Sequence, residues 1–178
     1  MSVDVKSHLR DIVPYLSYDI YFAYDYYYQL GTLQNVEFLI DVSYRPILRP
    51  MSDLCRVITS RGKTFVPIVE ISKLLGFDRS LHMNGAGKAC FTVADSDNDA
   101  LYDCIFEWDA DAQAFITRCP SFSGGYHIVD HHMSVPVLGF LHEHLFDYRG
   151  LIPAGVGVDI NTIDMYSITF TYDYVNEC

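Results

Sequence analysis

Apolar residues recur along the chain at two different spacings, and each spacing predicts a different kind of element. Helical spacing is found over residues 3–16, 69–75 and 134–148. Pro14 limits the first of these helices to a short segment, because proline is poorly tolerated within a helix. Gly76 is placed to close the second helix and Ser134 to cap the third.

Short apolar or alternating runs predict strands between and after these helices. The predicted strands cover residues 18–28, 35–44, 56–60, 63–66, 91–93, 102–108, 114–118, 127–129 and 166–174. The run 18–28 also fits a tyrosine-rich helix face, but its aromatic enrichment favours a strand. Separate helices among successive strands predict a single α+β domain, residues 1–178, with an antiparallel or mixed sheet.

Tyrosine is unusually frequent, with 14 residues in the chain. Tyrosines that line the core with their hydroxyls at its rim are one interpretation. The consecutive Tyr26, Tyr27 and Tyr28 cannot all be buried in one strand, because successive side chains point to opposite faces. Part of this tyrosine-rich surface is therefore expected to face outward or to contact a partner.

The composition of the 178 residues, half of them hydrophobic, predicts a sizeable core. The first residues lack the apolar stretch of a secretory signal, and no window is apolar enough to cross a membrane. The five cysteines are odd in number and contain no C-x-x-C pair. We therefore expect reduced, mostly buried thiols in a cytoplasmic protein.

The formal net charge of −11 excludes a general binder of duplex nucleic acid, which would repel the chain. Seven acids and no base lie between residues 95 and 111. This acidic segment is the first candidate binding site for a partner protein: Asp95, Asp97, Asp99, Asp103, Glu107, Asp109 and Asp111. A solvated set of loops is the alternative interpretation, and in both cases these carboxylates are predicted to be exposed.

A histidine-rich stretch offers a candidate metal site at His127, Asp130 and His131, which have ligand types suited to zinc or manganese. Residues 128–132, Ile-Val-Asp-His-His, resemble the third motif of DHH phosphoesterases. That resemblance implies a metal-dependent phosphoesterase as an alternative function. The acidic cluster before it lacks the family's Asp-Gly ending, and neighbouring histidines diverge in an extended chain. We expect no metal or other cofactor.

A basic set in the first half of the chain offers a candidate phosphate-binding site. Its members are Arg45, Arg49, Arg56, Arg61 and Lys63. If these side chains converge, the chain is a second kind of binder, a sponge for a nucleotide signal.

Two segments resemble a family of small uncharacterised proteins encoded by bacteriophages and prophages. Residues 46–54 read Pro-Ile-Leu-Arg-Pro-Met-Ser-Asp-Leu and are followed by Phe-Val-Pro at 65–67; residues 146–161 contain Gly-Leu-Ile-Pro and Asp-Ile-Asn. The family usually has Leu at the position of Met51, and residues 77–130 resemble nothing known. We expect both segments to be architectural, with Ile47 and Leu48 in the core.

The resemblance implies a mobile element acting inside a bacterial host, and it transfers no catalytic residue. We therefore expect a non-enzymatic interaction protein that binds a host or phage protein. Inhibition of a host defence or nucleic-acid enzyme through the acidic surface is one concrete form of this function.

Overall fold

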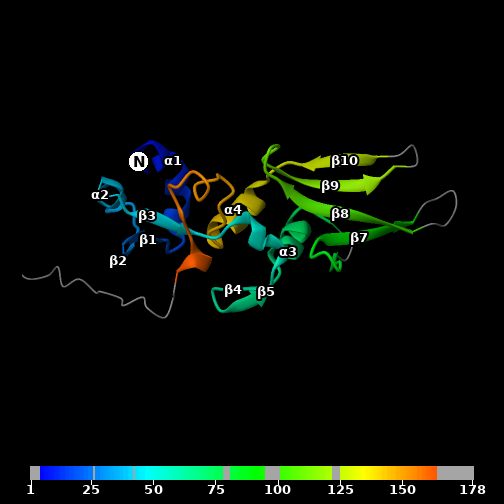
Figure 1. The fold of residues 1–178 in the computed structure, drawn as a ribbon, viewed down its shortest axis with the longest axis horizontal. Helices are drawn as coiled ribbons and strands as arrows, with labels where there is room; N and C mark the ends of the chain where they lie inside the picture. Colours follow the sequence, from blue (N-terminus) through cyan, green and yellow to red (C-terminus); the bar gives the residue numbers. More distant parts are fainter. Residues whose placement is uncertain are drawn as a thin grey trace, which may run out of the picture. The chain divides into compact units, whose positions relative to one another are not determined.

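The structure is a computed structural model that describes residues 5–25, 27–41, 43–77, 81–94, 101–121 and 125–163. The described residues form four α-helices and eleven strands in antiparallel and mixed sheets, which confirms the α+β class (Figure 1). Contacts divide the chain into two compact units. Unit 1 comprises residues 1–50 and 142–178, and unit 2 comprises residues 51–141.

Unit 1 contains a four-stranded mixed sheet in the order β11-β3-β1-β2. The β3–β11 pair is parallel, whereas β1 pairs with β2 and β3 in antiparallel fashion. Its helices and strands are α1 (Leu9–Ile12), β1 (Tyr21–Tyr24), β2 (Tyr27–Leu30), α2 (Val36–Asp41), β3 (Arg45–Leu48) and β11 (Val158–Asp159). Short 3-10 helices cover Val5–His8, Val13–Ser17 and Ile160–Thr162.

Unit 2 contains a five-stranded antiparallel sheet in the order β10-β9-β8-β7-β6 and a separate two-stranded hairpin. The hairpin is β4 (Ile58–Ser60) and β5 (Lys63–Phe65). The sheet strands are β6 (His82–Met83), β7 (Ala89–Ala94), β8 (Leu101–Asp109), β9 (Ala114–Pro120) and β10 (Tyr126–His131). A 3-10 helix covers Met51–Cys55, α3 covers Pro67–Leu74, and the second boundary between the units falls within α4 (Val135–Glu143).

Most strands of unit 2 and the helix that precedes its sheet lie where the sequence predicts them. The predicted turn joins β4 to β5, with Arg61 at φ 50° and Gly62 at φ 75°. α3 is followed by Gly76 at φ 78°, a conformation that glycine adopts readily after a helix. The four strands predicted between residues 91 and 129 are confirmed as β7 to β10, each a few residues longer.

The single strand predicted over 18–28 is wrong, because the structure divides this region into the hairpin of β1 and β2. Tyr24 pairs with Tyr27 at the end of the ladder, and Asp25 adopts φ 51° in the turn between them. Asp is among the few residue types that enter this left-handed region readily. The tight turn therefore folds a continuous apolar run back on itself.

The strand predicted over 35–44 is also wrong, because α2 occupies residues 36–41. The Asn35 side chain accepts a hydrogen bond from the Thr32 amide at 2.7 Å and donates one to the Leu30 carbonyl at 2.9 Å. This local turn starts the helix, and Val36, Leu39 and Ile40 then lie buried on one helical face. The apolar residues of this run satisfy helical spacing as well as a continuous strand.

The third predicted helix is shorter than its pattern suggests, because α4 ends at Glu143 and Leu145 adopts φ 60°. The cap predicted at Ser134 is wrong, since its buried hydroxyl oxygen has no hydrogen-bond partner among the described residues. The strand predicted over 166–174 lies outside the described residues.

The two segments that carry the family resemblance meet in unit 1. The Arg49 amide donates to the Leu145 carbonyl at 2.7 Å, and the Asp147 amide donates to the Arg49 carbonyl at 2.8 Å. Ile47 and Leu48 are almost fully buried, which confirms that they pack in the core. Both segments therefore contribute to one hydrogen-bonded framework.

A buried carboxylate organises the loop that follows this junction. Asp147 accepts hydrogen bonds from the amides of Leu151 at 2.8 Å and Ile152 at 2.7 Å. Gly155 adopts φ 76°, a conformation that glycine enters readily in a tight turn. A Cβ atom at Gly157 would lie 3.3 Å from the Ile152 nitrogen, so the backbone approaches itself closely there.

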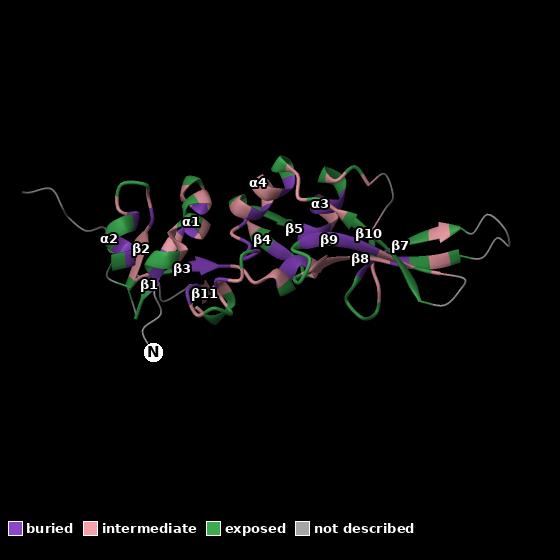
Figure 2. Cartoon of the chain, turned by 90° about the horizontal axis from the view of Figure 1, so that it is seen from above, coloured by how far each residue is buried: buried purple, intermediate pink, exposed green. Residues whose placement is uncertain are grey.

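Aromatic rings form the core of unit 2 on one face of the sheet. Phe106 is fully buried between Phe77, Phe115 and His131, with ring centroids 5.1 to 5.8 Å from its own. Phe77 follows α3 in sequence and also contacts the ring of Phe91. The burial pattern in Figure 2 agrees with this core, since β9 is largely buried whereas β10 is largely exposed.

Candidate interaction surfaces

Three tyrosines form a row across adjacent strands of unit 1. Tyr27 on β2 pairs with Tyr24 on β1, and the Tyr24 ring lies 5.3 Å from the ring of Tyr44, the residue before β3. Phe22 pairs with Pro46 and Ala23 with Arg45, and the same register places Tyr44 opposite Tyr24, one residue beyond the end of the ladder. We call Tyr24, Tyr27 and Tyr44 the tyrosine row.

The tyrosine row lies at the exposed end of a sheet face that is buried at Phe22. Phe22 lies on the same face as Tyr24 and is fully buried, whereas Tyr24 is 44% exposed and Tyr27 is 62% exposed. Asp25, in the turn beside them, is also exposed. Large aromatic surfaces with a polar tip are typical of protein-binding sites, because tyrosine loses little side-chain entropy on binding.

The tyrosine-rich surface expected from the sequence is thus partly located. Tyr28 lies half-buried on the other face, opposite Ala23, and Tyr26 lies outside the described residues. The sequence alone does not identify the row, because its members come from three separate segments and only the strand register brings them together.

The second exposed surface is β10, an edge strand of the sheet in unit 2. Tyr126, Ile128 and Val129 are 62%, 48% and 41% exposed, although they lie in a strand. Sequence reasoning treated this region as a source of metal ligands and missed the edge. The sequence pattern does indicate an exposed strand. Each face of the run carries both polar and apolar residues, whereas a half-buried strand has its apolar residues on one face only.

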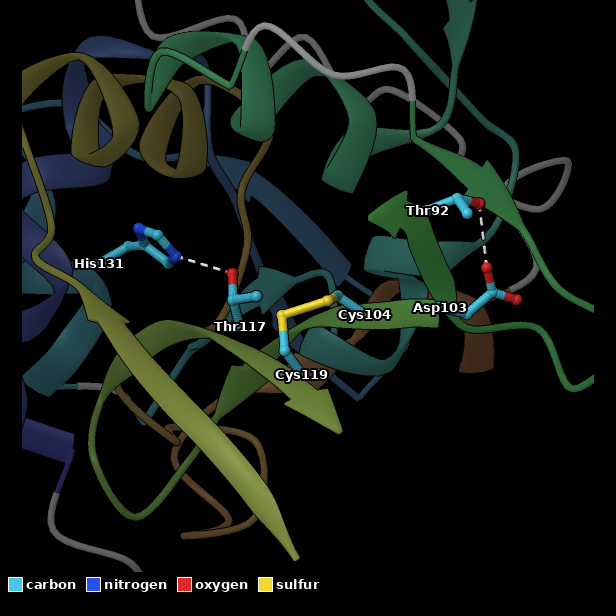
Figure 3. Close-up of a disulfide and its surroundings, with 6 residues drawn as sticks. All are labelled: Thr92, Asp103, Cys104, Thr117, Cys119 and His131. Carbon is cyan, nitrogen blue, oxygen red and sulfur yellow. Dashed lines mark hydrogen bonds between the residues drawn. A yellow bond between two sulfur atoms is a disulfide. The ribbon is translucent and has the colours of Figure 1, made fainter. Parts of the chain in front are cut away.

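The described part of the acidic segment does not form one continuous acidic face. Asp95, Asp97 and Asp99 lie outside the described residues. Asp103 is exposed and accepts a hydrogen bond from the Thr92 hydroxyl at 3.0 Å (Figure 3). Asp111 is exposed in the turn after β8.

The remaining two acids of the segment are half-buried and paired within the sheet. The Arg118 guanidinium binds the carboxylates of both Glu107 and Asp109. The ammonium of Lys88 lies 3.5 Å from the second oxygen of Glu107. These pairs fasten β8 to β9, so the two carboxylates are less available to a partner than those of exposed acids.

The candidate metal ligands of β10 are divided between the two faces of the strand. The pairing with β9 puts His127 and His131 on one face and Asp130 on the other. The His131 ring nitrogen lies 2.8 Å from the Thr117 hydroxyl, and its burial lowers the pKa of this histidine (Figure 3). No group of three metal-ligating side chains occurs in the part of the chain that the structure describes.

The basic set predicted from the sequence is divided between the two units. Arg45 and Arg49 belong to unit 1, and Arg56, Arg61 and Lys63 belong to unit 2. Arg56 is exposed and binds the buried Asp53 carboxylate at 3.3 Å. Arg61 and Lys63 are exposed around the turn of the β4–β5 hairpin.

The structure corrects the prediction that the cysteines are reduced thiols. Cys104 on β8 and Cys119 on β9 form a disulfide across adjacent strands, with their Cα atoms 4.4 Å apart (Figure 3). Their spacing along the sequence does not predict this disulfide, because only the register of β8 and β9 brings the two cysteines opposite each other. Cys55 and Cys90 are thiols whose pKa values are raised by burial, and Cys178 lies outside the described residues.

A pocket of about 350 Å³ lies in unit 2 and was not anticipated from the sequence. It is lined by Met51, Ser52, Leu54, Cys55, Ile68, Gly87, Glu107 and Trp108. Most of these side chains are apolar, and Glu107 is already bound by Arg118. The pocket therefore offers little unengaged polar chemistry with which to fix a ligand.

A histidine of unit 1 is held among aromatic rings. The His142 ring nitrogen lies 2.8 Å from the Tyr148 hydroxyl, and the ring meets that of Tyr15 edge-on at 5.0 Å. Burial lowers the pKa of His142, and the nearby positive charge of Arg149 lowers it further. The same burial raises the pKa of Tyr15, whose hydroxyl donates to the Phe146 carbonyl at 2.7 Å.

We expect the free energy of unfolding to fall as the pH is lowered through about 6.5, where histidine in the unfolded chain takes up a proton. His142 and His131 resist protonation in the folded state, so the unfolded state binds more protons and is favoured by acid. Each histidine contributes a slope of at most about 1.4 kcal/mol per pH unit. Urea unfolding between pH 7.5 and 5.5 measures this slope.

The variant His142→Gln retains a polar group beside Tyr148 and is expected to flatten this pH dependence. The matched change His132→Gln, at an exposed histidine, is the control for the substitution itself. An equal slope in wild type and His142→Gln would contradict the assignment.

Comparison with protein-family models, curated proteins and solved structures finds no significant match to this chain. None of the helices in the described ranges combines the length and apolar character needed to cross a membrane.

Proposed function

We propose that this chain is a phage- or prophage-encoded protein that acts in the cytoplasm of a bacterial host by binding a host or phage protein. The observation that carries the proposal is the tyrosine row, with Tyr24 and Tyr27 exposed side by side on adjacent strands. The origin and compartment rest on the family resemblance of residues 46–54 and 146–161.

The geometry of the row suits a protein partner. Tyrosine presents a large aromatic surface with a polar tip, and central aromatic residues commonly dominate interface energetics. The row is supported from below by the packed sheet, since Phe22 and Leu48 are fully buried. A rigid support lowers the entropy lost when the rings are fixed against a partner.

One exposed carboxylate beside the row and the net charge of the whole chain favour a basic partner. Asp25 is exposed in the hairpin turn, and the chain carries a net charge of −11. Arginine stacks on tyrosine rings and pairs with carboxylates, so a partner with exposed arginines matches both features. Enzymes that handle nucleic acid carry such basic surfaces, and inhibition of a host defence or nucleic-acid enzyme is the role we propose.

The acidic segment has a secondary part in this proposal. Asp103 and Asp111 are exposed and add long-range attraction for a basic surface, whereas Glu107 and Asp109 are engaged by Arg118. The tyrosine row therefore provides the short-range contacts and the net charge mainly accelerates the encounter.

The double variant Tyr24→Ser, Tyr27→Ser tests the proposal. Loss of two aromatic anchors is expected to reduce capture of the partner at least about ten-fold. Capture from a bacterial host lysate by tagged wild type and variant, quantified by mass spectrometry, gives the comparison. Circular dichroism of the purified variant confirms that the fold is retained.

The matched control is Phe38→Ser, which removes an aromatic side chain that is exposed to a similar fraction, 65% against 62% for Tyr27, but lies on α2 and outside the tyrosine row. It is expected to capture the partner as wild type does. A double variant that captures the same proteins as wild type, in equal amount, would refute a role of the tyrosine row.

A further inference from the structure

β10 lies at the edge of its sheet as far as the described residues extend. It pairs along its whole length with β9, and no strand of the described residues pairs with its other edge. An exposed strand edge with apolar side chains is a template for pairing with another strand. The exposed Tyr126, Ile128 and Val129 make β10 such an edge.

The hydrogen-bond pattern shows which backbone groups point outward. The Ser121 amide donates to the Gly125 carbonyl at 3.1 Å, which makes this a hydrogen-bonded pair of the β9–β10 hairpin. Such pairs recur at every second residue of an antiparallel ladder, so His127 and Val129 direct their amides and carbonyls toward β9. The backbone groups of Tyr126, Ile128 and Asp130 therefore point away from the sheet.

Two copies of β10 can pair in antiparallel fashion around a two-fold axis perpendicular to the sheet. Such an axis places each residue opposite one that belongs to the same face. Two registers pair most of the strand, one centred on Ile128 and the other centred on Val129. They differ in what lies opposite the charged side chain of Asp130.

The register centred on Ile128 is the complementary one. It places Ile128 opposite Ile128 of the second copy and Asp130 opposite Tyr126, whose hydroxyl can donate to the carboxylate. All three residues with outward backbone groups then face one another and form about six hydrogen bonds. The register centred on Val129 instead places the Asp130 charge opposite the apolar Ile128.

We propose that two copies of this chain associate through β10 in the register centred on Ile128, which joins their sheets into one continuous ten-stranded sheet. The proposal is independent of the tyrosine row, which lies in unit 1. The dimer carries two tyrosine rows, so a partner with repeated sites is bound with increased avidity.

The association is weak, because a single pair of short strands buries less than the roughly 1,200 Å² of a stable interface. Analytical ultracentrifugation over a wide range of concentration is the primary measurement. Wild type is expected to shift from monomer to dimer, with a dissociation constant on the order of 100 µM.

The variant Ile128→Pro removes an outward amide without breaking the β9 ladder, and proline is tolerated at such edge positions. It is expected to remain monomeric at every concentration. The matched control Ile128→Thr retains the amide and a branched side chain, and it is expected to dimerise more weakly than wild type but measurably. A monomeric wild type, or dimerisation of Ile128→Pro equal to wild type, overturns the proposal.

Disulfide cross-linking tests the register in a background with Cys55→Ser, Cys90→Ala and Cys178→Ser. Ile128→Cys places the two Cα atoms about 5.5 Å apart, within reach of a disulfide, and is expected to cross-link. Val129→Cys places them about 7–8 Å apart and is expected to give at least about five-fold less dimer under mild oxidation. Stronger cross-linking of Val129→Cys overturns the register.

The two proposals can fail separately. Loss of dimerisation in Ile128→Pro with unchanged partner capture supports the strand pairing alone. Loss of capture in Tyr24→Ser, Tyr27→Ser, with an unchanged dissociation constant of the dimer, supports the tyrosine row alone.

Discussion

Phe106→Ala is expected to lower the free energy of unfolding of unit 2 by about 3–5 kcal/mol. The ring of Phe106 is fully buried and stacks on the ring of Phe115, with their centroids 5.6 Å apart. The Phe106 ring also contacts that of Phe77, at a centroid distance of 5.1 Å. Its removal leaves a cavity among rings that are fixed by their strands. Trp108 is the single tryptophan and its ring lies 5.1 Å from Phe115, so its fluorescence in urea reports the unfolding of this core.

The matched control is Leu101→Ala, which removes an exposed apolar side chain from the same strand. Its effect is expected to remain within about 0.5 kcal/mol. If the two variants unfolded at the same urea concentration, Phe106 would not have the central position in the core that the ring contacts give it.

Asp147→Ala is expected to cost about 2–4 kcal/mol, because it leaves two inward-facing amides without acceptors. The carboxylate is buried and accepts from Leu151 and Ile152 at 2.8 and 2.7 Å. Burial raises the pKa of Asp147 and the amide hydrogen bonds oppose this effect. Hydrogen exchange of the Leu151 and Ile152 amides measures the local loss, and urea unfolding followed by tyrosine circular dichroism measures the total.

Asp147→Asn retains one carbonyl oxygen in the same place and is expected to lose about half as much stability as Asp147→Ala. Asp159→Asn changes an acid that caps the short helix at Ile160–Thr162 and is expected to have a small effect. Unchanged exchange of the two loop amides in Asp147→Ala would contradict the role assigned to this carboxylate.

The sheet of unit 2 could be predicted from the sequence because its signals are local. Each strand is a short apolar run, and polar turn formers such as those at 109–113 separate it from the next. The unit 1 elements at 18–28 and 35–44 could not be predicted, because their apolar runs fit two kinds of structure. A left-handed Asp25 and the side-chain hydrogen bonds of Asn35 decide between them.

The candidate surfaces could not be predicted from local sequence patterns, because they depend on how distant segments pair. The tyrosine-rich region was identified, but the row of Tyr24, Tyr27 and Tyr44 depends on the register of three strands. The same holds for the disulfide between Cys104 and Cys119, which depends on the register of β8 and β9. The acidic segment was read as a uniform feature, whereas Arg118 binds two of its members from the neighbouring strand.

The order of the two units along the chain has a consequence for synthesis on the ribosome. Unit 2 is one continuous stretch, residues 51–141. In unit 1, by contrast, β3 pairs with β11 at residues 158–159, which is synthesised after the whole of unit 2. Unit 2 is therefore complete and able to fold while unit 1 still lacks a strand. The chain leaves unit 1 after Pro50 and re-enters it at His142. Close to these two points in the sequence, the Arg49 amide donates a hydrogen bond of 2.7 Å to the Leu145 carbonyl. The intervening module could thus be replaced by another whose ends lie equally close, and the framework of unit 1 would be preserved.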